Sequence, residues 1–467
     1  MISIPLKIGN EDYYTIEKNI VTDLSGKAIA ECSMAPSIKV DQANDMFCAN
    51  KTSCRDIDIY QLIETFNRAA DIFKGNVLMG NEVLSFDDYI NIVVESTGLP
   101  VRYVKEGQAV IYYYFKNIGN ILKAQSPNMS LDVYNEHMYM KGNKTIGWIK
   151  DGIDVGVISP SNNSTVHTVW MMALAMKSQI MIKPSLNEVF TPLRIIQSLL
   201  DAGLPKEFVC FLPGNHKITN KILSTTSKGI LFGSSDVIDR YKKGFPNVKY
   251  YGPGSSKLFV DEDSGVDLDK VVTHAIDGIM SYGGKGCISI SSIICTKDGR
   301  KYSDSIAEKL SHTHIHNPLD TKAIIPAVKE TNLCTALNKY IQIMVDLGAE
   351  NMSQKYIGSD PYVVSENCNY LLPTVLYMEP THPMFGIELP FPFVTVTSAS
   401  GSLAKNLLRK SLAVSIISDD NEIYQELLQD ESIQMLHWGL LENVYDVDPE
   451  KPFEGFMSDY LFKVKTI

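Results

Sequence analysis

The sequence predicts an α/β protein built from parallel strands that are joined by helices. Two observations lead to this fold class. After Gly152, short apolar runs with strand character alternate with longer helical runs, and glycine, proline, asparagine and serine separate them. The chain of 467 residues is also long enough for two or three domains. A strand–helix–strand alternation at this spacing implies parallel strands with right-handed crossovers.

The segment before residue 154 is expected to contribute helices and a hairpin. Residues 1–55 mix short polar and apolar pieces around a turn at 23–27. Apolar residues recur at helical spacing further on. Three helices are expected, over residues 57–74, 86–96 and 105–118. Residues 136–150 are rich in strand formers, and Gly142-Asn143 within them is a hairpin signal.

The alternation is clearest between residues 155 and 250. The expected strands are 155–159, 180–182, 208–212 and 229–232, and the expected helices are 166–176 and 191–202. Ligands of parallel sheets bind beyond the carboxyl ends of the strands. The segments at those ends, which suit a dinucleotide, are Pro160-Ser-Asn162, Lys183-Pro-Ser185, Pro213-Gly214 and Gly233-Ser234. The G-x-G-x-x-G fingerprint is absent. A second α/β segment runs from about 251 to 430.

Composition and charge argue against several classes of protein. The net charge of −11 disfavours a nucleic-acid groove, which needs a basic stripe. The first residues do not resemble a signal peptide, and no apolar run approaches the roughly 20 residues that span a bilayer. The eight cysteines form no CxxC pair, which in a chain of this length indicates reduced thiols. We therefore expect a cytoplasmic protein without a nucleic-acid partner or a membrane span.

One cysteine follows a glycine-rich loop, in Ser281-Tyr-Gly-Gly-Lys-Gly-Cys287. Glycine lets the backbone approach a ligand closely. A thiolate at this position could attack a carbonyl carbon and form a covalent intermediate. The alternative is a small buried thiol that only fills space in a core. The motifs upstream of the cysteine favour the catalytic interpretation.

The order of these motifs resembles that of the aldehyde dehydrogenase superfamily over nearly the whole chain. The collinear segments are Pro160-Ser-Asn162, Lys183-Pro-Ser185, Ala202-Gly-Leu-Pro205, Gly233-Ser-Ser235, Asp267-Leu-Asp269, Cys287, Glu388-Leu-Pro-Phe-Pro-Phe393 and Val464-Lys-Thr-Ile467. The resemblance implies a Rossmann-type cofactor domain, an α/β catalytic domain and a β-hairpin oligomerisation flap. It also implies an NAD(P)-dependent oxidoreductase that acts on a small aldehyde or an acyl thioester.

By this resemblance, Cys287 is the nucleophile that attacks a carbonyl while hydride passes to or from a nicotinamide ring. Asn162 or Asn163 would form an oxyanion hole together with the Cys287 backbone N–H, and the alignment does not separate the two. Glu388 would hold the nicotinamide ribose, and Lys183 the adenosine ribose. The full set of cofactor-binding residues is expected to be Ser159, Pro160, Lys183, Ser185, Gly214, Gly233, Ser234, Gly252 and Glu388.

The sequence departs from the family's hydrolytic members at one position. Those members carry a glutamate that activates water, and here Tyr251 takes its place. A phenol is a poor base near neutral pH, because its unperturbed pKa is about 10. Gly252-Pro-Gly254 is instead similar to the Gly-Pro-Gly of CoA-acylating aldehyde dehydrogenases and acyl reductases. This favours coenzyme A as the group that takes or delivers the acyl chain. The alternative is hydrolysis to a carboxylic acid by a base recruited elsewhere, for example Glu262.

The choice between NAD and NADP stays open in the sequence. Leu186 stands where NAD-preferring members often carry a glutamate that binds the ribose diol. Without that carboxylate a 2′-phosphate meets no repulsion and could contact Lys183 and Ser185. Glu188, however, is close enough in the sequence to take the missing role.

The expected domains follow from the same resemblance. The cofactor domain would comprise residues 1–135 and 154–250, the catalytic domain 251–430, and the flap and last strand 136–153 and 431–467. Edge strands of such a hairpin can pair between subunits. A homodimer or homotetramer is therefore expected.

Three other features have simpler interpretations. His312-Thr-His-Ile-His316 invites a metal site, but no second ligand cluster is near it in the sequence, so no metal is expected. Asp267 and Asp269 are expected at a helix N-terminus, and His167 at the start of an apolar helix. The degraded motif Gly233–Ile238 leaves a further alternative, a catalytically weakened homologue that acts as a binding or structural protein.

Overall fold

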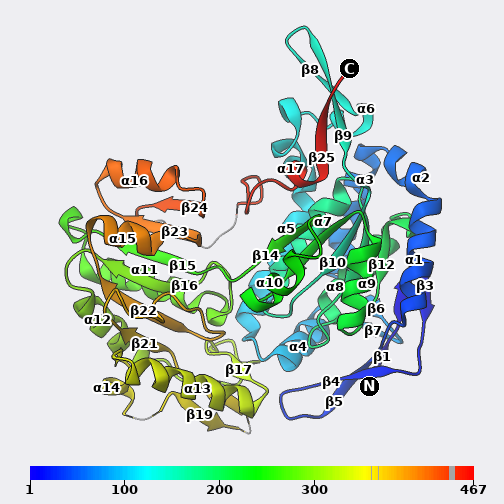
Figure 1. Cartoon of the computed structure of the whole chain (residues 1–467). Coiled ribbons are helices and arrows are strands. Elements are labelled where there is room, and N and C mark those ends of the chain that lie inside the picture. The colour runs from blue at the N-terminus through cyan, green and yellow to red at the C-terminus, as the bar shows by residue number, and fades with distance from the viewer. Residues whose placement is uncertain (359, 367, 441–447) are drawn as a thin grey trace. The chain divides into compact units, whose positions relative to one another are not determined.

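The computed structural model describes residues 1–358, 360–366, 368–440 and 448–467. The chain forms two compact units, whose helices and strands are labelled in Figure 1. The first unit comprises residues 1–96, 104–252 and 448–467, and the second comprises residues 97–103 and 253–447. Within the described residues, no helix has the length and apolar character needed to cross a membrane.

The first unit is organised around a seven-stranded sheet. Its strand order is β14 (Val248–Tyr251), β13 (Lys228–Phe232), β10 (Asp154–Ile158), β11 (Gln179–Lys183), β12 (Val209–Phe211), β2 (Leu6–Ile8) and β3 (Glu11–Tyr13). The strands from β14 to β12 are parallel, and β2 joins them antiparallel. The strand order reverses at β10, which has β11 on one side and β13 on the other. Parallel sheets bind ligands at such a switch point.

The predicted crossover helices are present beside this sheet (Figure 1). They are α7 (His167–Ala175) and α8 (Phe190–Asp201), and two further helices that the sequence did not predict, α9 (His216–Thr225) and α10 (Ser235–Lys242), belong to the same unit. Every residue of α7 is buried, which explains why its sequence is apolar without a polar face. The strands and helices predicted between residues 155 and 250 agree with the structure within about two residues. The predicted parallel α/β fold class is confirmed.

Helices also dominate the N-terminal part of the chain. The three predicted helices are α3 (Ile59–Phe73), α4 (Phe86–Thr97) and α5 (Val101–Ala124), of which α5 is longer than expected. The sequence did not predict α1 (Ser37–Ala49), which buries only Val40, Ala43 and Phe47 and so carries a weak periodic signal. The smaller elements of the unit are β1 (Ile2–Ile4), β4 (Lys18–Thr22), β5 (Ala28–Ser33), α2 (Lys51–Asp56), β6 (Val77–Met79), β7 (Glu82–Leu84), α6 (Val133–Glu136) and α17 (Met457–Leu461).

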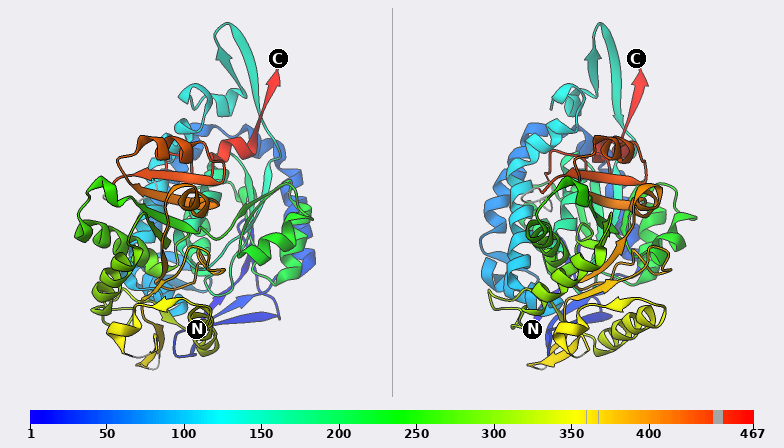
Figure 2. Two further views of the ribbon diagram at one scale, coloured as in Figure 1. Left: turned by 60° about the vertical axis from the view of Figure 1, so that its left-hand side comes forward. Right: turned by 90° about the vertical axis from the view of Figure 1, so that its left-hand side faces the viewer.

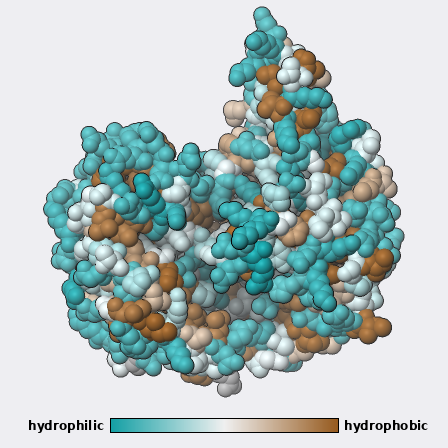
Figure 3. Space-filling model, in the orientation of Figure 1, coloured by the Kyte–Doolittle hydropathy of each residue, from teal (hydrophilic) through white to brown (hydrophobic). Residues whose placement is uncertain are grey.

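The hairpin predicted at Gly142-Asn143 is present. It consists of β8 (Met138–Lys141) and β9 (Lys144–Lys150), and β25 (Phe462–Thr466) pairs antiparallel with β9. These three strands, called the flap here, project from the first unit (Figures 1 and 2). Several large apolar side chains of the flap are exposed, namely Met138, Met140, Ile149 and Val464. Figure 3 shows hydrophobic residues gathered on this projection.

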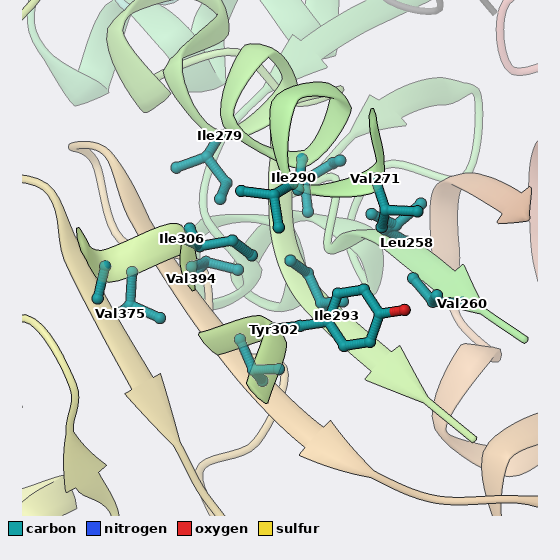
Figure 4. Packing of buried hydrophobic residues seen from close by; sticks show 14 of the residues in the cluster. Leu258, Val260, Val271, Ile279, Ile290, Ile293, Tyr302, Ile306, Val375 and Val394 are labelled. Carbon is teal, nitrogen blue, oxygen red and sulfur yellow. The ribbon is translucent and has the colours of Figure 1, made fainter. Parts of the chain in front are cut away.

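The second unit contains another seven-stranded sheet. Its order is β18 (Glu350–Asn351), β21 (Thr374–Tyr377), β22 (Phe393–Ser398), β16 (Ile290–Cys295), β15 (Ser256–Val260), β23 (Ser411–Ile417) and β24 (Ile433–Trp438). All neighbouring strands are parallel except β18 and β21. Helices α11 (Leu268–Met280) and α12 (Gly299–Ser311) pack on the sheet. Figure 4 shows the core of this packing, where Leu258 and Ile293 from the sheet meet Val271 and Ile306 from the helices.

Smaller elements complete the second unit. They are β17 (Ala327–Val328), α13 (Thr331–Asp346), α14 (Gln354–Ile357), β19 (Tyr362–Ser365), β20 (Cys368–Leu371), α15 (Gly401–Leu408) and α16 (Asn421–Leu428). Strands β17, β20 and β19 form a separate three-stranded antiparallel sheet.

Candidate active site

Cys287 lies in a loop whose backbone requires glycine. α11 ends at Met280, a short 3₁₀ turn follows over Ser281–Gly284, and the chain passes Cys287 before it enters β16. Gly284 has a φ of 69°, and a side chain there would collide with the backbone of Pro392. Glycine adopts this conformation without strain. The glycine-rich motif therefore fixes the path of the chain that leads to Cys287.

The Cys287 thiol is more accessible than most other thiols of the chain. Cys287 is half-buried, whereas the buried cysteines are Cys32, Cys54, Cys210, Cys295 and Cys334. Burial raises the pKa of Cys32 and Cys210 to about 12. Because the thiolate is the nucleophilic form, such buried thiols are unreactive. The accessibility of Cys287 fits a nucleophile better than a thiol that fills space in a core.

Residues at the start of β15 hold the backbone of Cys287. The Ser256 hydroxyl donates a hydrogen bond to the Cys287 carbonyl oxygen at 2.8 Å. Gly254 packs so closely against the same carbonyl that a Cβ at this position would overlap it. Only glycine permits such an approach of two backbones. The Gly-Pro-Gly segment, which ends at Gly254, is thus in direct contact with the candidate nucleophile's backbone.

Glu388 is bound to this same loop. Its Oε2 accepts a hydrogen bond from the Ser255 N–H at 2.9 Å, and the Gly254 N–H also donates to the carboxylate. Ser255 has a φ of 44°, a left-handed conformation that non-glycine residues seldom adopt. Burial raises the pKa of Glu388, and the two N–H donors oppose this rise. Glu388 therefore anchors the loop behind Cys287, and ribose binding by its carboxylate stays a prediction.

The two candidate oxyanion-hole asparagines have different surroundings. Asn163 is buried, and its Oδ1 accepts a hydrogen bond from the Thr165 N–H at 2.9 Å at the start of the 3₁₀ turn Ser164–Val166. Because this cap engages the oxygen, the amide NH₂ of Asn163 is the group left to donate elsewhere. Asn162 is exposed. The cap therefore gives Asn163 a fixed orientation.

The predicted cofactor-binding residues of the first unit follow the carboxyl ends of its parallel strands. They are Ser159 and Pro160 after β10, Lys183 and Ser185 at the end of β11, Gly214 after β12, Gly233 and Ser234 after β13, and Gly252 after β14. Ser159 Oγ is buried and has no hydrogen-bond partner in the described part of the chain. Burial lowers the pKa of Lys183 to about 8. An orphaned hydroxyl and a half-buried amine at the carboxyl ends of neighbouring strands fit a bound ribose or phosphate.

Glu188 has another role in the structure. Its Oε1 accepts hydrogen bonds from the N–H groups of Phe190 and Thr191, each at 2.8 Å, and the side chain is buried. His167 is buried beside it, with its Nε2 at 3.9 Å from Glu188 Oε2. The His167 Nδ1 accepts a hydrogen bond from the Trp170 indole. Glu188 therefore caps α8, and His167 lies at the start of α7 as the sequence predicted.

Neither Tyr251 nor Glu262 is suited to activate water for Cys287. Tyr251 is buried and stacks on Phe232 with ring centroids 4.7 Å apart, and burial raises its pKa well above the usual value. Glu262 follows the carboxyl end of β15, whereas Cys287 contacts the amino end of this strand at Ser256. Five strand residues span about 16 Å. The hypothesis that Glu262 is the recruited base is therefore wrong.

The histidine-rich segment does not form a strand that would align its imidazoles. His312 lies at the end of α12, and His316 Nδ1 is 3.9 Å from a carboxylate oxygen of Asp320. Among the described residues, no group of three or more histidine, cysteine, aspartate or glutamate side chains is arranged to hold a metal ion. The prediction for Asp267 is confirmed, since its carboxylate caps α11 by accepting from the Lys270 N–H at 3.1 Å.

Comparison with known proteins identifies the family. The aldehyde dehydrogenase family model matches residues 19–456, so the chain belongs to this family and the predicted resemblance is confirmed. The malonate-semialdehyde dehydrogenase of Listeria monocytogenes serotype 4a (strain HCC23) is 25% identical over 207 residues, which cover 42% of this chain and 42% of that protein. The malonate-semialdehyde dehydrogenase of Lacticaseibacillus casei is 27% identical over 204 residues, which cover 42% and 41%. The match spans less than half the length of these curated relatives.

Solved structures share the fold over the whole chain. The aldehyde dehydrogenase KauB from Pseudomonas aeruginosa superposes with a TM-score of 0.81 at 16% identity, covering 100% of this chain and 96% of KauB. The glyceraldehyde-3-phosphate dehydrogenase GapN from Methanocaldococcus jannaschii DSM 2661, complexed with NADP, gives 0.77 at 16% identity, with 97% and 99% covered. At these identities the similarity concerns the fold alone. The predicted aldehyde dehydrogenase-like architecture is confirmed.

Proposed function

We propose that this chain is an NAD(P)-dependent oxidoreductase that interconverts an aldehyde and an acyl thioester through Cys287. The observation that carries this proposal is a half-buried Cys287 whose carbonyl is held by Gly254 and Ser256. Family membership supports the reaction type. The buried Tyr251 at the position of the water-activating glutamate supports transfer to a thiol rather than to water.

The chemistry proceeds through a bond between Cys287 and the substrate carbon. In the oxidative direction the Cys287 thiolate attacks the aldehyde carbon, and the carbonyl π electrons move to the oxygen. A nicotinamide cofactor held at Ser159 and Lys183 would supply the hydride acceptor for this step. As the carbonyl re-forms, the C–H bond breaks with its electron pair and a thioester remains on Cys287. The coenzyme A thiolate then attacks this thioester, and the Cys287 thiolate leaves.

Asn163 is the proposed side-chain donor to the oxyanion of this reaction. Its amide oxygen is engaged by the Thr165 N–H, so its NH₂ is oriented by a contact that does not involve substrate. Preorganised donors of this kind stabilise the negative charge that develops on oxygen. The Cys287 backbone N–H is the second proposed donor, as the family resemblance implies. The exposed Asn162 is not assigned a catalytic role.

The cofactor is proposed to bind at the carboxyl edge of the sheet in the first unit. The orphaned Ser159 hydroxyl and the half-buried Lys183 amine, whose pKa is lowered, support this placement. We favour NADP over NAD, because Glu188 caps α8 and Leu186 carries no charge to repel a 2′-phosphate. Among the fold neighbours, the GapN structure is complexed with NADP and an indole-3-acetaldehyde dehydrogenase structure with NAD⁺.

We assign a different role to each of the two units. In this proposal the first unit binds the cofactor, and the second unit supplies the nucleophile. The flap, with its exposed Met138, Met140 and Val464, is proposed to pair with another subunit in a homodimer or homotetramer. Residues 441–447, part of the segment expected to belong to the flap and last strand, lie outside the described residues.

The test is the requirement for coenzyme A. Aldehyde-dependent formation of NADPH is measured with a panel of medium-chain and aromatic aldehydes, with and without coenzyme A. We expect turnover only with coenzyme A, and acyl-CoA as the product. Turnover that yields a carboxylic acid without coenzyme A would contradict the acyl-transfer proposal and favour hydrolysis. No binding of NADH or NADPH, together with an unreactive Cys287 thiol, would favour the non-catalytic alternative.

A further inference from the structure

A cavity lies in the first unit, near the amino-terminal ends of two parallel strands of its sheet. It has a volume of about 660 Å³ and is lined by Lys150, Lys177, Arg55, His137, Asp58 and Phe462, among others. Lys150 and Lys177 precede β10 and β11, so the cavity is at the amino ends of these strands. The proposed cofactor residues follow the carboxyl ends of the same strands. Within the first unit, this cavity is therefore separate from the proposed cofactor-binding residues.

Two lysines in the cavity have only neutral hydrogen-bond acceptors. Lys177 is 3% exposed, and its Nζ donates to the Tyr134 carbonyl at 2.7 Å and to Asn135 Oδ1 at 2.8 Å. Lys150 Nζ donates to the Met176 carbonyl and to the Ser178 hydroxyl, each at 2.6 Å. An ammonium group has three N–H donors. Each lysine thus retains one donor that these contacts do not use.

Among the described residues, neither lysine has a carboxylate in direct contact with its ammonium group. Burial and the nearby Lys177 lower the pKa of Lys150 well below the usual value, and burial lowers that of Lys177 to about 8. The carboxylates that line the cavity, Asp58 and Asp56, attract Lys177 from beyond hydrogen-bond distance, and their own hydrogen bonds are made to other groups. Asp58 accepts from Asn135 at 2.6 Å and caps α3, and Asp56 pairs with Arg55 at 2.8 Å. In the described part of the chain, neither lysine forms an ion pair with a carboxylate.

We propose that this cavity binds a small organic anion whose phosphate or carboxylate group is held by Lys150 and Lys177. An anion would accept the unused N–H donors and compensate the positive charges of the buried Lys177 and the half-buried Lys150 at once. The volume is in the range of small-molecule sites and exceeds what a lone phosphate fills. Phe462 and Tyr134 supply an aromatic wall for the organic part of the ligand. This site does not depend on the proposed chemistry of Cys287.

The test uses inorganic phosphate and phenyl phosphate as probes of the full-length protein. Binding is measured by titration calorimetry in the presence of saturating NADPH, which keeps the probes out of the cofactor site. We expect saturable binding of both probes, and tighter binding of phenyl phosphate because of the aromatic wall. Lys177→Met is expected to weaken binding about tenfold, as the loss of one charge-assisted hydrogen bond predicts.

Two further variants keep the test decisive if Lys177→Met fails to fold. Ile149 is 39% exposed and lines the cavity, so Ile149→Glu places a negative charge there without removing a lysine contact. This variant should also lower the affinity for both probes. The control is Lys116→Met, which removes a lysine of α5 that pairs with Asp71, and it should leave the affinity unchanged. The proposal is overturned if neither probe binds saturably, or if Ile149→Glu binds the probes as tightly as the wild type does. It is also overturned if Lys183→Met, at the proposed cofactor site, abolishes probe binding while the cavity variants do not.

Discussion

Cys287 is positioned through its backbone. Its carbonyl accepts from Ser256, its main chain is in contact with Gly254, and Glu388 fastens the loop that contains both contacts. A thiol attached to a fixed backbone has few orientations to lose when it attacks a carbonyl, and such preorganisation lowers the entropic part of the barrier. Residues that never contact the substrate are therefore expected to affect the rate.

Glu388 should act as a positioning residue even in the absence of cofactor. Glu388→Ala leaves two backbone N–H groups without their acceptor, so we expect lower thermal stability and a loss of about ten- to a hundredfold in kcat. Glu388→Gln keeps one acceptor oxygen and should recover part of the activity. The matched control is Glu379→Ala, which changes an exposed glutamate on the same unit.

Thiol labelling separates this role from ribose binding. The rate at which iodoacetamide alkylates Cys287 is measured in the free protein, in which no ribose is present. We expect Glu388→Ala to change this rate and Glu379→Ala to leave it unaltered. If Glu388→Ala is labelled at the wild-type rate and is as stable as the wild type, but binds the cofactor more weakly, the carboxylate serves only to bind the cofactor.

The two asparagines can be distinguished by a substitution that keeps the cap. Asn163→Asp retains the oxygen that accepts from Thr165 but loses the NH₂ donor. We expect kcat to fall about 10²- to 10³-fold, as for other oxyanion-hole donors, with little change in thermal stability. Asn162→Ala should have a small effect on both quantities. A fully active Asn163→Asp variant would restrict Asn163 to capping.

Lys183 should give NADPH binding a pH dependence that NADH binding lacks. Its pKa of about 8 means that the free protein carries the positive charge below this pH and loses it above. A 2′-phosphate binds the charged form, so the affinity for NADPH should fall as pH rises through 8, by up to about tenfold per unit. Fluorescence titrations at pH 7 and pH 9 measure this, and Lys183→Met should remove the difference. Equal pH profiles for the two cofactors would rule out a contact between Lys183 and the 2′-phosphate.

Among the elements, the flap exposes apolar side chains, whose contact with water is unfavourable in an isolated subunit. Trp148 of β9 and Phe462 of β25 stack at 3.9 Å, which fixes the two strands to each other. Outside this contact, Met140 and Val464 remain 52% and 67% exposed. Exposed apolar groups on a projecting sheet are typical of interfaces. The flap is therefore the element expected to join subunits.

A charge on the flap should weaken the oligomer. Val464→Asp combined with Met140→Asp places two carboxylates on the exposed face, and we expect the sedimenting mass to shift toward that of a monomer. The control is Ile20→Asp, which changes a 50% exposed strand residue of β4. Analytical ultracentrifugation at several protein concentrations measures the change. An unchanged mass in the double variant would remove the flap from the interface.

For the whole molecule, local patterns in the sequence predicted much of the architecture. The strands of the first unit are short β-branched runs bounded by glycine or proline, and this signal placed β10, β11 and β13 within about one residue. The hairpin turn at Gly142-Asn143 and the Asp267 cap of α11 could also be predicted, because each depends on residues that are close together in the sequence. Family resemblance supplied the order of the units and singled out Cys287.

Contacts between distant residues could not be predicted in this way. Glu388 and Ser255 are 133 residues apart, and no periodicity or local motif relates them. Glu188 is a different case: the contact that engages its carboxylate is local, with the N–H groups of Phe190 and Thr191 at the start of α8, but the sequence did not show that this cap would take the carboxylate away from ribose. Glu262 is likewise near in sequence to β15 but follows the end of the strand that is remote from Cys287. Side-chain position in a site is set by packing, which single-sequence patterns do not report.

The central claim is that Cys287 carries the acyl group between the nicotinamide and the acceptor thiol. Intact-protein mass spectrometry after mixing the protein with NADP and an aldehyde, without coenzyme A, tests it most directly. We predict a mass increase equal to the acyl group, located on the peptide that contains Cys287, absent from Cys287→Ala and removed on addition of coenzyme A. Full aldehyde turnover by Cys287→Ala, or an acyl group on another residue, would contradict the account.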